Sequence, residues 1–204
     1  MMQYLSPIIF LSILLLGCGS DDISEPTVNL PSEKHEESVT LSSFNLSDEY
    51  IYWEIRVGNM SHQEPTDDRV IAKYDEEIYS NLTPTEISLL ESIDSVTGFD
   101  AQCAPSYCPV FGVALLSNSA VAIESKQDLL RFFGDIDTVA ELSRWISSNN
   151  YSLKKYEVTD YGYRVIASWD NNCGRRGEDL IKVFKDGTIE KIKELSSESY
   201  NGCV

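Results

Sequence analysis

Residues 152–195, SLKKYEVTDYGYRVIASWDNNCGRRGEDLIKVFKDGTIEKIKEL, contain four runs that favour β-strands. The runs cover residues 153–158, 163–169, 180–184 and 188–195. In the second run, alternate positions carry residues that would share one face of a strand: Tyr163, Val165, Ala167 and Trp169. Asp160-Tyr161-Gly162 is typical of a turn, and Asp186-Gly187 is typical of a two-residue hairpin turn. The stretch therefore predicts an antiparallel C-terminal meander.

Helix signals precede this meander. Thr83-Pro84-Thr85-Glu86 combines a capping box with proline at the first helical position. Ser125 with Asp128, and Thr138 with Glu141, give two further helix starts. The runs between and before them favour strands at residues 49–57, 69–74, 110–116 and 120–123. Helices and antiparallel strands in separate runs predict an α+β fold with antiparallel sheets and about three helices.

The N-terminus predicts an export signal. Residues 7–16, PIIFLSILLL, are too short to span a bilayer, which takes about 20 helical residues, and have the length of a signal-peptide core. Leu15-Leu16-Gly17-Cys18 resembles the lipobox of bacterial lipoproteins, although Met1-Met2-Gln3-Tyr4 lacks the usual basic residues. This resemblance covers residues 1–18. It implies cleavage between Gly17 and Cys18 and a lipid anchor, palmitate included, on Cys18.

The alternative is an ordinary signal peptide with an incidental cysteine, or an uncleaved short anchor. For a lipoprotein, Gly19 after the cysteine implies the outer rather than the inner membrane, with a periplasmic or a surface orientation. Residues 18–47 are rich in Ser, Glu, Asp and Pro and predict a flexible acidic tether. Residues 48–204 then form one α+β domain.

Charge excludes one class of partner. The net charge is −17, and residues 19–100 carry 19 acidic and 4 basic residues. Such a surface repels phosphate backbones, so we expect no nucleic acid partner. It also repels anionic headgroups, so contact with a membrane has to come from the lipid anchor.

Four cysteines remain after Cys18, and an even number in an exported chain predicts disulfides. We favour Cys103–Cys108 and Cys173–Cys203, because the meander brings Cys173 and Cys203 to one end of its sheet. The other two pairings stay open. A zinc site is disfavoured because only one of the pairs is close in sequence, and a redox role is disfavoured because the close pair lacks CxxC spacing.

One segment resembles other proteins. Residues 133–141, FGDIDTVAE, are similar to a stretch in uncharacterised secreted proteins of bacteria such as myxobacteria. The resemblance extends loosely over residues 110–204. Those proteins have no known activity, so the resemblance implies none here.

Motifs for catalysis are weak. His35 lies in the tether and His62 in a polar loop, and Ser152-Leu153-Lys154-Lys155 matches S-x-x-K without its partner motifs. Arg175-Arg176 is interpreted as surface charge rather than an anion site. We therefore predict a lipid-anchored envelope protein, without cofactor or metal, that binds a protein or glycan or has a structural role. The alternative is an envelope hydrolase, which would use carboxylates such as Asp67-Asp68, Asp75-Glu76-Glu77 or Asp135 with Asp137.

Overall fold

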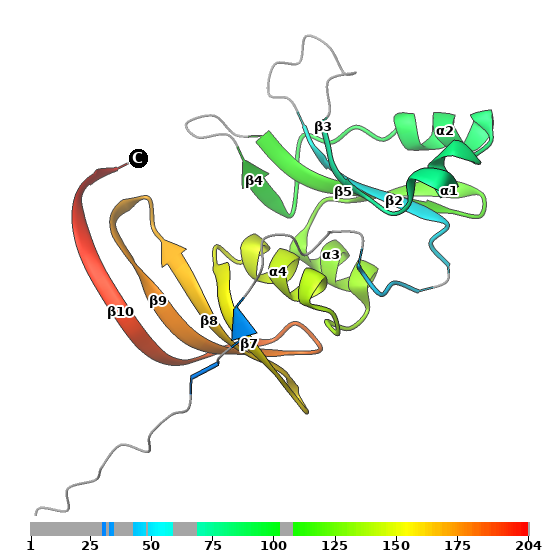
Figure 1. The fold of residues 1–204 in the computed structure, drawn as a ribbon. Coiled ribbons are helices and arrows are strands. Elements are labelled where there is room, and N and C mark those ends of the chain that lie inside the picture. The colour runs from blue at the N-terminus through cyan, green and yellow to red at the C-terminus, as the bar shows by residue number, and fades with distance from the viewer. Residues whose placement is uncertain are drawn as a thin grey trace, which may run out of the picture.

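The computed structural model describes residues 30–31, 33–34, 43–47, 49–58, 69–102 and 108–203. Two antiparallel sheets, each of five strands, lie on either side of a pair of helices (Figure 1). The predicted α+β fold with antiparallel sheets is confirmed.

The meander sheet has the strand order β1-β7-β8-β9-β10. Its four long strands follow one another in sequence: β7 (Ser152–Thr159), β8 (Gly162–Asp170), β9 (Cys173–Phe184) and β10 (Ile189–Cys203). The predicted C-terminal meander is confirmed, and β9 and β10 extend beyond their predicted ends to Cys173 and Cys203. The hairpin between them turns at Gly187, whose φ of 83° lies in the left-handed region that favours glycine.

The N-terminal sheet contains β2 (Tyr52–Val57), β3 (Arg69–Lys73), β4 (Asp100–Gln102), β5 (Cys108–Leu116) and β6 (Ser119–Ile123). Its order is β3-β2-β5-β4, and β6 also pairs with β5. Strand β5 is buried along almost its whole length, which accounts for its continuous apolar run.

Four helices are present among the described residues: α1 (Glu76–Ser80), α2 (Pro84–Glu91), α3 (Lys126–Phe133) and α4 (Val139–Ser148). The capping boxes predicted for α2, α3 and α4 are all formed, at Thr83, Ser125 and Thr138. The short helix α1 is not predicted by the sequence, and it begins after an Asp75 cap. No described helix combines the length and the hydropathy needed to cross a membrane.

One core connects the two sheets through α3 and α4. It includes Trp53 from β2, Phe132 from α3 and Leu142 from α4, together with Val165 from β8. A smaller core lies between the N-terminal sheet and α1 and α2, around Tyr52, Leu90, Phe111, Val113 and Leu115. The neighbouring aromatic residues Tyr52 and Trp53 of β2 therefore both belong to the core.

Parts of the predicted tether belong to the folded unit. Phe44 is 7% exposed and stacks on Trp53, with ring centroids 4.8 Å apart. The Asn45 amide donates to Glu141 Oε1 at 2.6 Å. Strand β1 (Glu33–Lys34) pairs with Lys155 and Tyr156 of β7. The prediction of a flexible tether through residue 47 is therefore wrong for these parts. The sequence could not show this, because single apolar residues that follow no helix or strand period give no signal of packing. Residues 1–29, with Gly17 and Cys18, lie outside the described residues.

Strand β2 carries a buried polar network. Arg56 Nε donates to Glu54 Oε2 at 2.8 Å, and Arg56 Nη1 donates to the carbonyls of Leu90 and Ile93 at 3.3 and 3.2 Å. Tyr52 Oη donates to the second carboxylate oxygen of Glu54 at 2.9 Å. The two charges are therefore paired and hydrogen-bonded, which is the condition for burying them.

The described residues include one cysteine of each favoured pair, Cys108 and Cys173. Cys108 and Cys173 are disulfide-bonded. In the β9–β10 ladder, Cys203 lies directly opposite Cys173. Cys103 and the side chain of Cys203 lie outside the described residues, so the connectivity stays a prediction.

Candidate binding cleft

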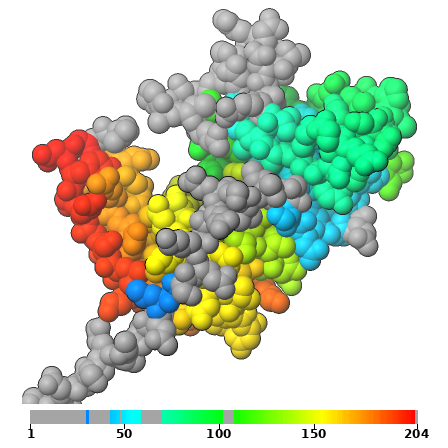
Figure 2. Space-filling view, viewed as in Figure 1, coloured from blue at the N-terminus to red at the C-terminus, as the bar shows by residue number. Residues whose placement is uncertain are grey.

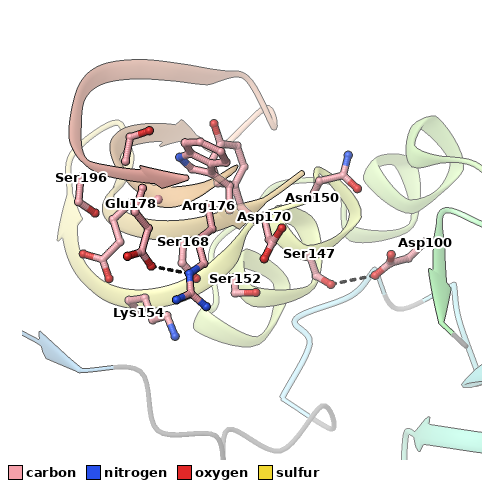
Figure 3. Close-up of a pocket in the computed structure, with 15 residues that line it drawn as sticks. Asp100, Ser147, Asn150, Ser152, Lys154, Ser168, Asp170, Arg176, Glu178 and Ser196 are labelled. Atoms are coloured by element: carbon pink, nitrogen blue, oxygen red, sulfur yellow. Dashed lines mark hydrogen bonds and ion pairs between the residues drawn. The ribbon is translucent and has the colours of Figure 1, made fainter. Parts of the chain in front are cut away.

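An open cleft of about 720 Å³ lies where the meander sheet meets the C-terminal end of α4 and strand β4 (Figure 3). Figure 2 shows the surface indented between the ends of β9 and β10 and the N-terminal sheet. All four long meander strands contribute to the lining, along with the segment that joins α4 to β7.

A row of polar side chains crosses the four strands at this end of the sheet. The register places Ser152 of β7 opposite Ser168 of β8, Ser168 opposite Glu178 of β9, and Glu178 opposite Ser196 of β10. Residues directly opposite in neighbouring strands present their side chains on the same face. We call Ser152, Ser168, Glu178 and Ser196 the open row, because within the described chain their side chains have no hydrogen-bond or ion-pair partner.

A second row, two residues further along, is internally paired. Here Asp170 lies opposite Arg176, and Arg176 lies opposite Glu198. Arg176 forms an ion pair with Glu198, and its guanidinium lies 5.8 Å from the centre of the Tyr200 ring. Tyr200 Oη donates to Asp170 Oδ1 at 2.7 Å. We call Asp170, Arg176 and Glu198 the closed row, since these groups are engaged with one another or with Tyr200.

The opposite wall of the cleft comes from α4 and β4. Ser147 Oγ donates to Asp100 Oδ2 at 2.8 Å, which joins the last turn of α4 to the start of β4 (Figure 3). Asn150 follows the helix with a φ of 63°, a left-handed conformation that asparagine tolerates. Lys154 lines the cleft from β7 with an exposed ammonium that has no carboxylate partner among the described residues.

Trp169 lines this cleft and also a neighbouring hollow of about 500 Å³. The ring lies against Gly177, where an added Cβ would come within 2.9 Å of Trp169 Cζ2. The Arg175 guanidinium lies 5.9 Å from the ring centre. Trp169 Nε1 is buried and has no hydrogen-bond partner in the described chain. The indole therefore presents a ring surface at the junction of the two hollows, while its N–H is buried beneath it.

The pKa shifts of carboxyl groups differ between the cleft and the core. The hydrogen bond from Tyr200 and the bond from the Asn172 amide lower the pKa of Asp170, which favours its ionised form. Burial raises the pKa of Glu141, but this carboxyl group caps α4 inside the core. It accepts from the Thr138 amide at 2.9 Å and the Asp137 amide at 3.0 Å. Glu141 therefore has a structural role at the start of the helix.

The structure brings together few of the residues noted in the sequence. Of Arg175-Arg176, Arg176 belongs to the closed row and Arg175 lies over Trp169, so both have side-chain partners. Asp137 accepts from the Asn45 side chain at 2.9 Å and lies away from the cleft. His35, His62 and the pair Asp67-Asp68 lie outside the described residues. Asp75 caps α1 through the Glu77 amide.

The open row is not predictable as a group from the sequence, although Ser152 belongs to the S-x-x-K match. Its members lie 16, 10 and 18 residues apart, so nothing in their spacing marks them as neighbours. Only the strand register would have identified them, and that register depends on the lengths of β9 and β10. No family model matches the chain, and comparisons with curated proteins and with solved structures find no similar protein.

Proposed function

We propose that this protein is a lipid-anchored bacterial envelope protein whose α+β domain binds a hydroxyl-rich ligand, a glycan, in the cleft of the meander sheet. The observation that carries the ligand class is the open row. Three serine hydroxyls and one carboxylate lie side by side on four neighbouring strands without partners in the described chain.

The chemistry of the row suits a sugar. A serine hydroxyl both donates and accepts, and the Glu178 carboxylate accepts only, so together they match hydroxyl groups of either hydrogen-bonding sense. Lys154 adds donors at one end of the row, and Trp169 adds an aromatic surface at the edge of the cleft. An open hollow with many hydrogen-bonding groups and one large ring suits a polar ligand better than an apolar one.

The hydrolase alternative has less support. An acid–base hydrolysis of glycosides needs one carboxylic acid whose pKa is raised and a second carboxylate across the scissile bond. In the cleft, the pKa of Asp170 is lowered, and Glu198 is engaged by Arg176. Glu141 is the carboxyl group whose pKa is raised by burial. It is fully buried and caps the start of α4. These features favour binding without turnover.

The anchor is the second part of the proposal, and it rests on the lipobox. Each buried methylene contributes about 0.8 kcal/mol, so a cysteine with two or more acyl chains stays at the membrane. We expect Cys18→Ala to abolish incorporation of labelled palmitate in the bacterial host. Labelling that persists in this variant would remove the anchor from the proposal and leave the ligand class untouched.

Ligand binding is tested by isothermal titration with two defined oligosaccharides, chitotetraose and maltotetraose. We expect at least one of them to bind the wild-type domain. Ser168→Ala and Glu178→Gln should each weaken this binding by about tenfold, since each leaves a ligand group without its partner. Ser199→Ala is the matched control, because Ser199 is exposed on β10 and does not line the cleft.

Three results would contradict the proposal. The first is wild-type protein that binds neither oligosaccharide nor soluble peptidoglycan fragments. The second is binding that Ser199→Ala reduces as much as Ser168→Ala does. The third is the release of shorter sugars by wild-type protein but not by Glu178→Gln, which would establish the hydrolase instead.

A further inference from the structure

Two of the charged groups that line the cleft have no partner within the described chain. The lining contains four carboxylates and two cations, on Asp100, Asp170, Glu178, Glu198, Lys154 and Arg176. Arg176 and Glu198 form an ion pair. The two aspartates accept hydrogen bonds from hydroxyl groups. Lys154 and Glu178 remain, and neither side chain has a hydrogen-bond or ion-pair partner among the described residues.

Lys154 lies at a β-bulge in the wall of the cleft. The register between β7 and β8 shifts between Leu153 and Lys155, so Lys154 is the extra residue on β7. A bulge changes the direction in which a strand presents its side chain. Lys154 is exposed and lines the cleft together with Ser152 of the open row. Its ammonium group is therefore accessible to a ligand that lies along this row.

Glu178 lines the same cleft from β9, two strands away from β7 (Figure 3). Ser168 of β8 lies between them and directly opposite Glu178. Neighbouring strands are about 4.8 Å apart, so β7 and β9 are separated by roughly 10 Å across the sheet. Lys154 and Glu178 form no ion pair with each other. The two opposite charges can therefore contact different groups of one ligand, on either side of the Ser168 hydroxyl.

The chemistry of the two side chains restricts the ligand. A lysine ammonium only donates hydrogen bonds and a carboxylate only accepts them, so Lys154 suits a carboxylate and Glu178 suits an ammonium group. Four carboxylates and two cations leave the lining with a formal charge of −2, and the whole chain has a net charge of −17. A purely anionic ligand is repelled by this field, whereas a zwitterion has no net charge and is not.

We propose that Lys154 and Glu178 form a paired charge subsite that selects a sugar with both an amino group and a carboxylate. This inference rests on the proposed function and narrows its ligand from glycans in general to zwitterionic ones. The Lys154 ammonium pairs with the carboxylate of the ligand, and the Glu178 carboxylate pairs with its ammonium. The Ser168 hydroxyl binds a hydroxyl group of the sugar between these two contacts.

Four matched sugars test the subsite: N-acetylglucosamine, glucosamine, N-acetylmuramic acid and muramic acid. All have the same ring. The two muramic acids add a carboxylate on a lactyl ether, and the two sugars without an acetyl group have a free amine. Dissociation constants are measured at neutral pH by nuclear magnetic resonance titration of the backbone amides. We expect the carboxylate and the amine each to tighten binding by about fivefold, so that muramic acid binds most tightly. Added salt should reduce both gains.

Substitutions assign each gain to one side chain. Lys154→Met should abolish the gain from the carboxylate and keep the gain from the amine, and Glu178→Gln should do the reverse. Lys154→Arg keeps the charge and should keep the carboxylate gain. Lys185→Met is the matched control, because Lys185 is an exposed lysine beyond the opposite end of β9 and outside the cleft. It removes the same charge and should keep both gains. Circular dichroism and the melting temperature establish that each variant is folded.

The outcomes separate this inference from the proposed function. N-acetylglucosamine or chitotetraose bound as tightly as muramic acid overturns the charge subsite and leaves the glycan proposal in place. Gains that persist in both Lys154→Met and Glu178→Gln, or that Lys185→Met reduces equally, also overturn the subsite. Muramic acid bound through both residues, without binding of any neutral sugar, supports the subsite and removes neutral glycans from the proposed function. Binding of none of the four sugars or the oligosaccharides removes both proposals.

Discussion

Polar residues have different roles in the two sheets. In the N-terminal sheet, Glu54 and Arg56 are almost completely buried, and each has its partners within the fold. In the meander sheet, Glu178 of the open row is partly exposed and has no partner among the described residues. Buried charges have to be satisfied by the protein itself, whereas polar groups beside an open cleft are satisfied by water or by a ligand. The presence or absence of a hydrogen-bond or ion-pair partner within the fold therefore distinguishes structural polar residues from those available for binding.

The largest expected effect tests this distinction directly. Glu54→Ala leaves the Arg56 charge buried without its carboxylate, so we expect the free energy of unfolding to fall by about 3–5 kcal/mol. Glu178→Ala should change it by at most about 0.5 kcal/mol, as is usual for a substitution away from the core. Urea unfolding followed by circular dichroism measures both. Similar losses in the two variants would remove the contrast between the sheets.

A somewhat smaller loss in the free energy of unfolding is expected at the cleft end of β9 and β10. Residues 173 and 175–176 of β9 are exposed there, so burial contributes little to holding the two strands together. If Cys173 is bonded to Cys203, the bond closes a loop of about 30 residues and contributes about 3–4 kcal/mol in the loop-entropy model. Cys203→Ser should therefore lower the free energy of unfolding by about this amount, whereas Cys103→Ser should have a smaller effect because its ring is short. Non-reducing peptide mapping that shows Cys173 bonded to another cysteine would contradict the pairing.

The third effect concerns the link between the two sheets. Phe44 stacks on Trp53 of β2 and packs edge-on against Phe133 of α3, with ring centroids 5.1 Å apart. Phe44→Ala should lower the free energy of unfolding by about 3 kcal/mol, and Phe44→Leu by less than half of that. Amide exchange should report the same loss in β2 and in β8, since one core contains residues of both strands. A loss confined to the N-terminal sheet would show that the sheets unfold separately.

The fold is predictable from the sequence where local signals are strong. The capping boxes at Thr83, Ser125 and Thr138 are short patterns with a direct physical cause, and each is formed. The hairpin is also formed around Asp186-Gly187, but its loop is longer than the predicted two-residue turn, because β9 ends at Phe184 and β10 begins at Ile189. Phe44 was missed because a single aromatic residue in a polar segment has no period. The open row was missed because neighbours across a sheet depend on strand register, which bulges alter; the β9–β10 ladder has shifts between Glu194 and Ser196 and between Ser199 and Cys203.

The smallest expected effect concerns the closed row and is a change of pKa rather than of overall stability. The Tyr200 hydroxyl donates to Asp170 and is the main cause of the lowered pKa of that carboxyl group, with the Asn172 amide second. Tyr200→Phe should therefore raise the pKa of Asp170 toward its ordinary value, as measured by the pH dependence of its carboxyl carbon resonance. A carboxyl group whose pKa is lower in the folded state stabilises the fold above its unfolded pKa, and this contribution is lost as the pH falls through the folded pKa. The stability difference between wild type and Tyr200→Phe should thus be present at neutral pH and shrink in acid. An unchanged Asp170 titration in the variant would show that the closed row is held by the Arg176–Glu198 pair alone, and that its polar groups are as available to a ligand as those of the open row.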